Sequence, residues 1–375
     1  MRKFKLFSIF GFDISIDLSW FLILGLVIWS LASGLFPNLY PELSTPTYWV
    51  MGTVAAILLF ISVLVHELSH SLMARKHGLE IGGIRLFIFG GVSEMTEEPE
   101  NPKAEFRIAI VGPITSVIIA GIFYLLTLLP LEQWSTPTAA ILSYLAILNL
   151  ALAIFNIVPG FPLDGGRVLR AILWGKFENI KKATNIASKV GKVIAFLLIA
   201  FGAMTAFAGN IVGGIWYIFI GMFLNMAAES GVRQVVMRQA LQGVKVNEIM
   251  SRDVVTVSPD LDAKSLVDNY IMKYRFDMFP VVNDAGELVG LVELNDVKDL
   301  SQDQWSETNI EQIMEPVEED SVLHPNDEAV DCLNSMIRTR EQGRMPVIDD
   351  ENELVGVVTR KDIMNLLKIK TDLGN

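Results

Sequence analysis

The chain has 375 residues, of which 51% are hydrophobic, and its mean hydropathy is +0.43. These values exceed those of soluble domains, so part of the chain is expected in a membrane. The formal net charge of −12 is uneven, because residues 1–240 carry 17 basic and 14 acidic side chains whereas residues 241–375 carry 13 and 28. The acidic C-terminal part argues against nucleic acid as a partner, and the single cysteine, Cys332, excludes a disulfide within the chain.

Long stretches without charge predict about six transmembrane helices. They are expected at 18–36, 49–75, 108–131 and 134–158, with two more within 193–228, divided by a glycine-rich break. Residues 80–95 are too short and too glycine-rich for a span, so they predict a short membrane-associated β hairpin, followed by an acidic loop that includes Glu105.

Basic residues give the expected orientation of these helices. They precede the first helix and follow the second, the fourth (Arg170 among them) and the sixth, but are absent from the other three connections. By the positive-inside rule the N- and C-termini are therefore cytoplasmic. The chain is expected to be an integral protein of the cell membrane.

From about Val244 the composition becomes that of a soluble α/β domain and contains an internal repeat. The positions that recur 66 residues later are Pro259, Pro280, Gly290 and Asp296, repeated as Pro325, Pro346, Gly356 and Asp362. Each copy has a helical stretch and then two apolar strands around a turn, and two copies are expected to pack together. The expected domains are 1–235, 244–300 and 307–370.

The stretch from His66 to His70, in the second predicted helix, has the pattern H-E-x-x-H. His66 and His70 lie one turn apart on one face, where two imidazoles can bind one metal ion. Glu67 lies about 100° further round the helix, beside the metal, where a general base can take a proton from metal-bound water. The alternative is a buried histidine pair hydrogen-bonded to backbone. Because Arg75 marks the membrane surface, the motif predicts a metal site inside the membrane.

A third ligand must come from elsewhere, and Asp164 is the candidate. It lies in segment 156–166, where Pro159 and Pro162 interrupt the helix and neighbouring glycines allow a close approach to the metal. The alternative is an ordinary Asp-Gly turn at a membrane exit. Glu94, in a charged loop, and Glu229, at an expected helix end, are weaker candidates.

Four motifs together resemble the site-2 protease family of intramembrane zinc metalloproteases. They are H-E-L-S-H, F-G-G-V at 89–92, Gly112-Pro113, and N-x-x-P-x-x-P-L-D-G-G at 156–166. The resemblance implies that His66, His70 and Asp164 bind Zn²⁺ and that Glu67 is the catalytic acid/base. It also implies that Asn156 holds the substrate or the developing oxyanion. The strand at 87–92 would pair with an unwound segment of a membrane-protein substrate within the lipid bilayer.

The repeat resembles a tandem CBS-domain pair. In that family a Thr/Ser-x-x-Asp stretch contacts the ribose of an adenine nucleotide such as AMP, ADP or ATP. The second copy matches with Thr359 and Asp362, whereas the first keeps Asp296 but has Glu293 in place of the hydroxyl residue. Two alternatives stay open: a nucleotide-binding regulatory module, or a ligand-free module for homodimerisation or substrate sensing.

The expected fold is thus a polytopic α-helical membrane protein with about six transmembrane helices and a short membrane-associated β hairpin, plus a soluble α/β tandem CBS domain. The expected function is intramembrane zinc proteolysis, regulated by cytoplasmic CBS domains. The alternative function is a CBS-gated, metal-dependent membrane transporter without peptidase activity. Glu67 discriminates between the two, because a carboxylate that does not bind the metal has its use in water activation.

Overall fold

The structure is a computed structural model, and it describes residues 3–88, 90–95, 98–129, 135–317, 321–338 and 344–372. The chain forms two compact units, Met1–Val235 and Val236–Asn375. Phe89, of the F-G-G-V motif, lies outside the described residues, as does the side chain of Glu94.

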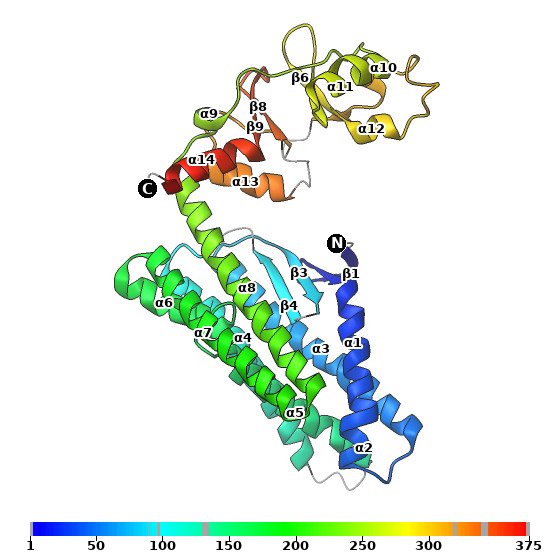
Figure 1. Cartoon of the computed structure of the whole chain (residues 1–375), viewed down its shortest axis with the longest axis vertical. Helices are drawn as coiled ribbons and strands as arrows, with labels where there is room; N and C mark the ends of the chain where they lie inside the picture. The colour runs from blue at the N-terminus through cyan, green and yellow to red at the C-terminus, as the bar shows by residue number, and fades with distance from the viewer. Residues whose placement is uncertain are drawn as a thin grey trace. The chain divides into compact units, whose positions relative to one another are not determined.

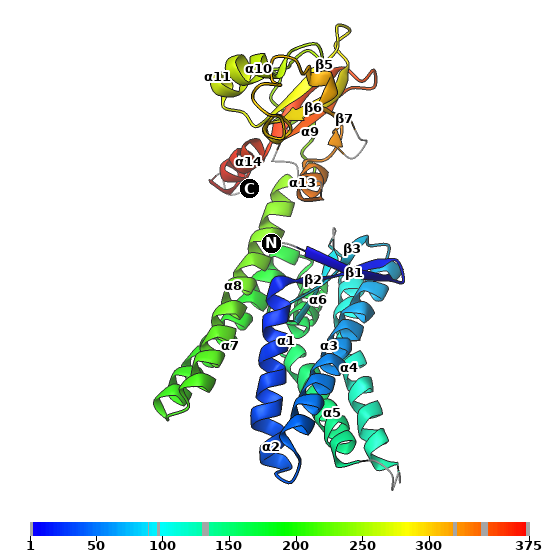
Figure 2. The same ribbon diagram turned by 90° about the vertical axis from the view of Figure 1, so that its right-hand side faces the viewer.

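The first unit is a bundle of long helices with a small sheet at one end (Figures 1 and 2). Six candidate spans occur among the described residues, which confirms the expected number. The first, Leu18–Leu39, consists of α1 (Leu18–Ser30), the π-helix η1 (Leu31–Leu35) and α2 (Phe36–Leu39). The other five are α3 (Thr45–Lys76), α4 (Pro102–Leu128), α5 (Thr136–Asn156), α7 (Ile180–Phe207) and α8 (Ile211–Leu241). Some helices begin before the charge-free stretches, because polar residues cap their N-termini. Asn101, for example, accepts a hydrogen bond from the backbone of Ala104, and Pro102 occupies the first turn of α4.

One further helix, α6 (Asp164–Phe177), was not predicted. The expected irregular segment ends at Leu163, and Asp164 is the first residue of α6 rather than part of a free turn. Helix α6 packs against α4 and α7. Arg170, which the sequence assigned to the cytoplasmic surface, is buried in it, and Glu105, expected in a loop, is buried within α4. The expected loop position of Glu105 was wrong, and the two buried charges are partners of each other.

The sheet has four strands in the order β1 (Lys3–Ile9), β2 (Phe12–Asp17), β3 (Ile81–Phe87) and β4 (Gly90–Met95). The hairpin of β3 and β4 was predicted, although 87–92 spans its turn and is not one strand. Strands β1 and β2 were not predicted. Strand β2 runs parallel to β3 and buries Phe12 and Ile14 against Leu68 of α3, so the sheet is fixed beside the H-E-x-x-H motif.

The second unit contains the two copies of the repeat. Its strands are β5 (Met278–Val282), β6 (Leu288–Glu293), β7 (Glu315–Pro316), β8 (Arg344–Ile348) and β9 (Leu354–Thr359). Its helices are α9 (Val246–Ile249), α10 (Ala263–Ser265), η2 (Leu266–Ile271), α11 (Met272–Tyr274), α12 (Leu294–Lys298), η3 (Ile310–Gln312), α13 (Ala329–Arg338) and α14 (Arg360–Asp372).

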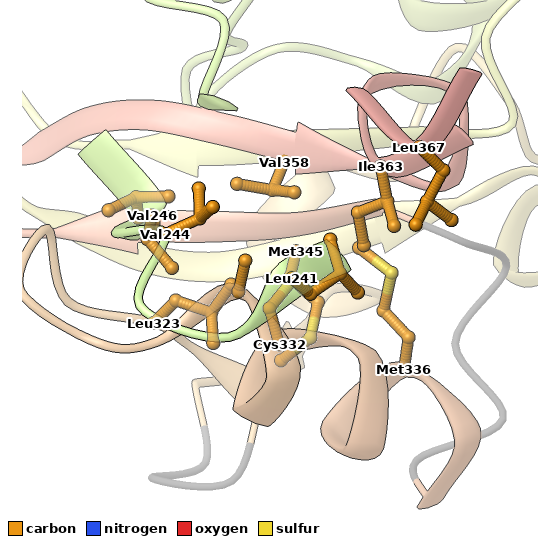
Figure 3. Packing of buried hydrophobic residues seen from close by; sticks show 12 residues of the cluster. Leu241, Val244, Val246, Leu323, Cys332, Met336, Met345, Val358, Ile363 and Leu367 are labelled. Atoms are coloured by element: carbon orange, nitrogen blue, oxygen red, sulfur yellow. The ribbon is translucent and has the colours of Figure 1, made fainter. Parts of the chain in front are cut away.

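The two copies have the same register and interlock. Phe279 pairs with Val292 in the first hairpin, and Met345 pairs with Val358 in the second, at the 66-residue offset. Each hairpin contributes to its own apolar core, and Figure 3 shows the one that contains Met345 and Val358. A Cβ on Gly290 would lie 2.7 Å from the sulfur of Met314, and one on Gly356 would lie 2.8 Å from that of Met250, so each glycine makes room for a methionine near the start of the other copy.

Candidate active site

Three side chains from two helices converge in the first unit. His66 and His70 lie on one face of α3, and Asp164 comes from the start of α6. Asp164 Oδ2 lies 3.1 Å from His66 Nε2 and 3.2 Å from His70 Nε2, and the two Nε2 atoms are 3.2 Å apart. The histidines are 3% and 4% exposed. The structure thus brings together the three residues that the sequence singled out as ligands.

The outer nitrogens of the two imidazoles have partners that fix their orientation. His70 Nδ1 lies 2.6 Å from the carbonyl oxygen of Ile108, which can only accept, so Nδ1 carries the proton and Nε2 presents a lone pair. His66 Nδ1 lies 2.8 Å from Ser116 Oγ. Neither the Ser116 hydroxyl nor the Ile108 carbonyl was predicted as a partner of the histidines, because a serine in an apolar helix carries no sequence signal of such a role.

The donor set fits zinc. Two histidine nitrogens and one carboxylate oxygen are typical zinc ligands, and bonds of about 2.0–2.1 Å in a tetrahedral arrangement place neighbouring donor atoms roughly 3.4 Å apart. The three donor atoms lie at 3.1–3.2 Å from one another. Lone pairs of two buried imidazoles and a carboxylate repel at that distance unless a proton or a cation lies between them. This arrangement therefore suits a metal ion with three protein ligands.

Two glycines make the room that the site requires. A Cβ at Gly112 of α4 would lie 2.1 Å from His70 Nε2 and 2.7 Å from His66 Nε2. A Cβ at Gly91 of β4 would lie 2.3 Å from Glu67 Cγ. Any larger residue at either position would displace a side chain of the H-E-x-x-H motif.

The turn that delivers Asp164 is closely packed against its surroundings. A Cβ at Gly165 would lie 2.1 Å from the Ile157 carbonyl oxygen, and a Cβ at Gly191 of α7 would lie 2.1 Å from that of Phe161. The Phe161 backbone nitrogen also donates to the Ala187 carbonyl at 3.3 Å. Contacts with α7 therefore hold this turn in place.

The remaining candidates differ in their surroundings. Glu67 follows His66 on α3 and is half-buried, and its Oε2 accepts a hydrogen bond from Ser93 Oγ at 3.3 Å. Asn156 is the last residue of α5, also half-buried, and its side chain has no hydrogen bond within the part of the chain that the structure describes. Glu229 lies inside α8, not at a helix end, and pairs with Lys192 of α7 at 2.7 Å, so it is not a ligand of this site.

The second unit holds a separate polar hollow of about 460 Å³. Both copies line it: Phe276 comes from the first copy, and Arg344, Thr359 and Asp362 come from the second. Thr359 Oγ1 donates to Asp362 Oδ2 at 2.6 Å, and the two residues cap the start of α14.

Asp296 accepts a hydrogen bond from the backbone of Glu293 in the equivalent cap and does not line the hollow. Burial raises the pKa of Asp296 above its usual range. The structure thus separates Asp296 from the two residues of the second copy.

Known proteins resemble this chain over both of its units. Peptidase family M50 matches residues 54–133 and 131–198, and the CBS domain matches residues 246–303 and 310–369. Rip3 of Mycobacterium tuberculosis is 33% identical over 361 residues, which cover 96% of this chain and 91% of that protein. Zinc metalloprotease MJ0392 of Methanocaldococcus jannaschii is 32% identical over 376 residues, 98% of each chain. The solved site-2 protease of M. jannaschii is 34% identical and covers 62% of this chain and 96% of that one, with a TM-score of 0.44. The chain belongs to Peptidase family M50 and is an integral-membrane zinc metalloprotease with a pair of CBS domains.

Proposed function

We propose that His66, His70 and Asp164 bind the zinc ion of this intramembrane metalloprotease and that Glu67 is its acid/base. The convergence of three donor atoms within 3.2 Å of one another carries this proposal. Glu67, one residue after the first histidine, lies outside this set of donors, as a proton acceptor must. The substrate class is a membrane protein cleaved in or near a transmembrane segment.

The chemistry divides between the ion and the protein. A zinc ion with three protein ligands, when bound, polarises the scissile carbonyl and lowers the pKa of a water molecule. Glu67 takes the proton of the attacking water and returns it to the leaving amine, while Ser93 orients the carboxylate. Ile108 and Ser116 hold the imidazoles in position. Asn156 is proposed to bind the substrate chain.

Strand β4 is proposed to hold the substrate in extended form. In the order β1-β2-β3-β4 it is an edge strand, so within the described ranges one side of its backbone has no partner strand and can pair with another chain. The closeness of Gly91 to Glu67 Cγ brings this edge beside the catalytic carboxylate. A helical substrate would have to unwind to pair there, which exposes its peptide bonds to hydrolysis.

The site is tested by metal analysis of purified protein. Wild-type protein should hold about one zinc per chain, and His66→Ala, His70→Ala and Asp164→Ala should each lower that content. If Asp164→Ala keeps full zinc and full activity, the third ligand is wrong. The activity is tested by comparing membrane-protein fragments in cells that express wild-type or Glu67→Gln protein, since fragments present only with wild type identify substrates. A transporter would give the same fragments in both.

The CBS pair is proposed to regulate proteolysis by binding an adenine nucleotide in the hollow of the second unit. The hollow combines a carboxylate and a hydroxyl for ribose, Asp362 and Thr359, with the cations Arg344, Arg360 and Lys361 for phosphate. Millimolar AMP, ADP or ATP should raise the thermal stability of the protein, and Thr359→Ala should weaken that shift. Absence of any shift would favour the ligand-free alternative. Asp296 is the weaker candidate, because it lies outside this hollow.

The proposed placement follows the charge pattern. The protease domain (1–235) lies in the cell membrane with both termini cytoplasmic, and the CBS repeats (244–300 and 307–370) lie in the cytoplasm and bind no nucleic acid. A homodimer through the CBS repeats is proposed from their match to the CBS family. Protease treatment of inverted and right-side-out vesicles tests the orientation. The CBS repeats should be digested only in inverted vesicles, and digestion from the outside would contradict the assignment.

A further inference from the structure

Two opposite charges are buried together where α4 meets α6. Glu105 of α4 is fully buried and Arg170 of α6 is 5% exposed. Arg170 Nε donates to Glu105 Oε1 at 2.5 Å, and its Nη2 contacts the same oxygen. Arg170 Nη1 also lies 3.6 Å from Glu98 Oε1. The pair is therefore a close, desolvated link between the two helices.

A buried ion pair has a cost that a surface pair does not. Removing two charges from water is unfavourable, and apolar residues of similar size often stabilise a fold equally well. Glu105 Oε2 is moreover buried without a hydrogen-bond partner among the described residues. General stability is thus a weak explanation for these charges, whereas an ion pair of fixed geometry specifies how α6 lies against α4.

Both partners are close to the groups that form the metal site. Glu105 lies three residues before Ile108, whose carbonyl holds His70. Arg170 lies on the same helix as Asp164, six residues further on, and its guanidinium also stacks over the ring of Phe161 at 5.1 Å, in the turn before Asp164. Arg170 therefore contacts both α4 and the turn that delivers the carboxylate.

We propose that Glu105 and Arg170 are positioning residues that set α6 against α4 so that Asp164 Oδ2 reaches both histidines. The inference rests on the proposed ligand role of Asp164. Neither residue touches the ligand atoms directly, and the effect is transmitted by the rigid first turns of α6. Loss of the ion pair shifts α6 and weakens the bond from Asp164 to zinc, while both histidines stay in place on α3.

The experiment measures zinc affinity of the purified full-length protein in detergent, by competition with a chelator. Glu105→Gln removes the charge and keeps the size of the side chain, whereas Arg170→Lys keeps the charge and removes the guanidinium group. Two variants are made, so that the test still holds if one of them fails to fold. Each should lower zinc affinity about 10–100-fold, as loss of supporting residues around a metal typically does. The matched control is Lys192→Gln, which breaks an exposed ion pair between α7 and α8 and should leave affinity unchanged.

A double-mutant cycle separates positioning from general destabilisation. In an Asp164→Ala background, Glu105→Gln should cause no further loss of affinity, because the ligand through which it acts is gone. When Arg170→Lys protein is saturated with Co²⁺, its visible spectrum should shift from that of the wild type towards that of Co²⁺-loaded Asp164→Ala protein.

Equal losses in both backgrounds would overturn the proposal, as would unchanged affinity in both single variants. If Asp164→Ala itself keeps wild-type affinity, the proposed ligand set fails and the positioning role fails with it.

Discussion

Replacing Gly112 by alanine tests the packing around the two histidines. Its Cβ would lie 2.1 Å from His70 Nε2, 2.5 Å from His70 Cε1 and 2.7 Å from His66 Nε2. Since non-bonded atoms normally stay about 3.5 Å apart, the His70 ring would have to retreat by more than about 1 Å. A zinc–nitrogen bond is about 2.0–2.1 Å long, so that retreat breaks it. A misplacement of about 1 Å commonly costs about 100-fold in rate.

The assay is zinc content and cleavage rate of the purified variant, with Gly121→Ala as the matched control. Both glycines lie within α4, and alanine is the better helix former by about 1 kcal/mol at either position. A Cβ at Gly121 meets nothing within 4 Å. We expect Gly121→Ala to be neutral or stabilising and Gly112→Ala to lose zinc and at least about 100-fold in activity. Full zinc content and full activity in Gly112→Ala would refute the reasoning about this contact.

Three further predictions follow from single residues. Ser116→Ala removes the partner of His66 Nδ1 and should lower zinc affinity about 10–100-fold, measured by chelator competition, without abolishing binding. An unchanged affinity would mean that the packing of α4 alone orients the His66 ring. Burial raises the pKa of the Cys332 thiol to about 12, and its side chain is fully buried, so a thiol reagent at pH 8 should label this single cysteine only when the second unit opens. Rapid labelling of the native protein would contradict the buried position. An adenine nucleotide should slow that labelling in wild-type protein and have less effect in Thr359→Ala, and equal slowing in both would remove Thr359 from the proposed site.

Local patterns were sufficient to predict the spans and the common helix face of His66 and His70. The spacing of His66 and His70 fixes their common helix face, and charge-free length alone is enough to count membrane helices. The 66-residue offset likewise predicted two copies whose hairpins have the same register. Each of these features depends on residues that are near in sequence or that recur at a fixed distance.

Two features that depend on distant partners were not predicted. Strand β2 has a period-two pattern of buried residues, but it joins the β3–β4 hairpin only through parallel pairing with β3, in which Ile14 lies opposite Ile84. Arg170 has the composition of a cytoplasmic flank, and only the fold reveals the buried carboxylate of Glu105 that pairs with it. A basic residue near a membrane helix therefore has two physical explanations, and burial decides between them.

The role of Glu67 as the base can be tested by measuring how fast purified Glu67→Gln protein cleaves a membrane-protein substrate. The zinc content is determined on the same sample. Glutamine keeps the size of the side chain but cannot accept the proton from the attacking water. We expect wild-type zinc content and a cleavage rate about 10²–10⁴-fold lower, with uncleaved substrate accumulating on the enzyme. Cleavage at the wild-type rate, or loss of zinc from this variant, would contradict the assignment of Glu67 as the base beside a site formed by His66, His70 and Asp164.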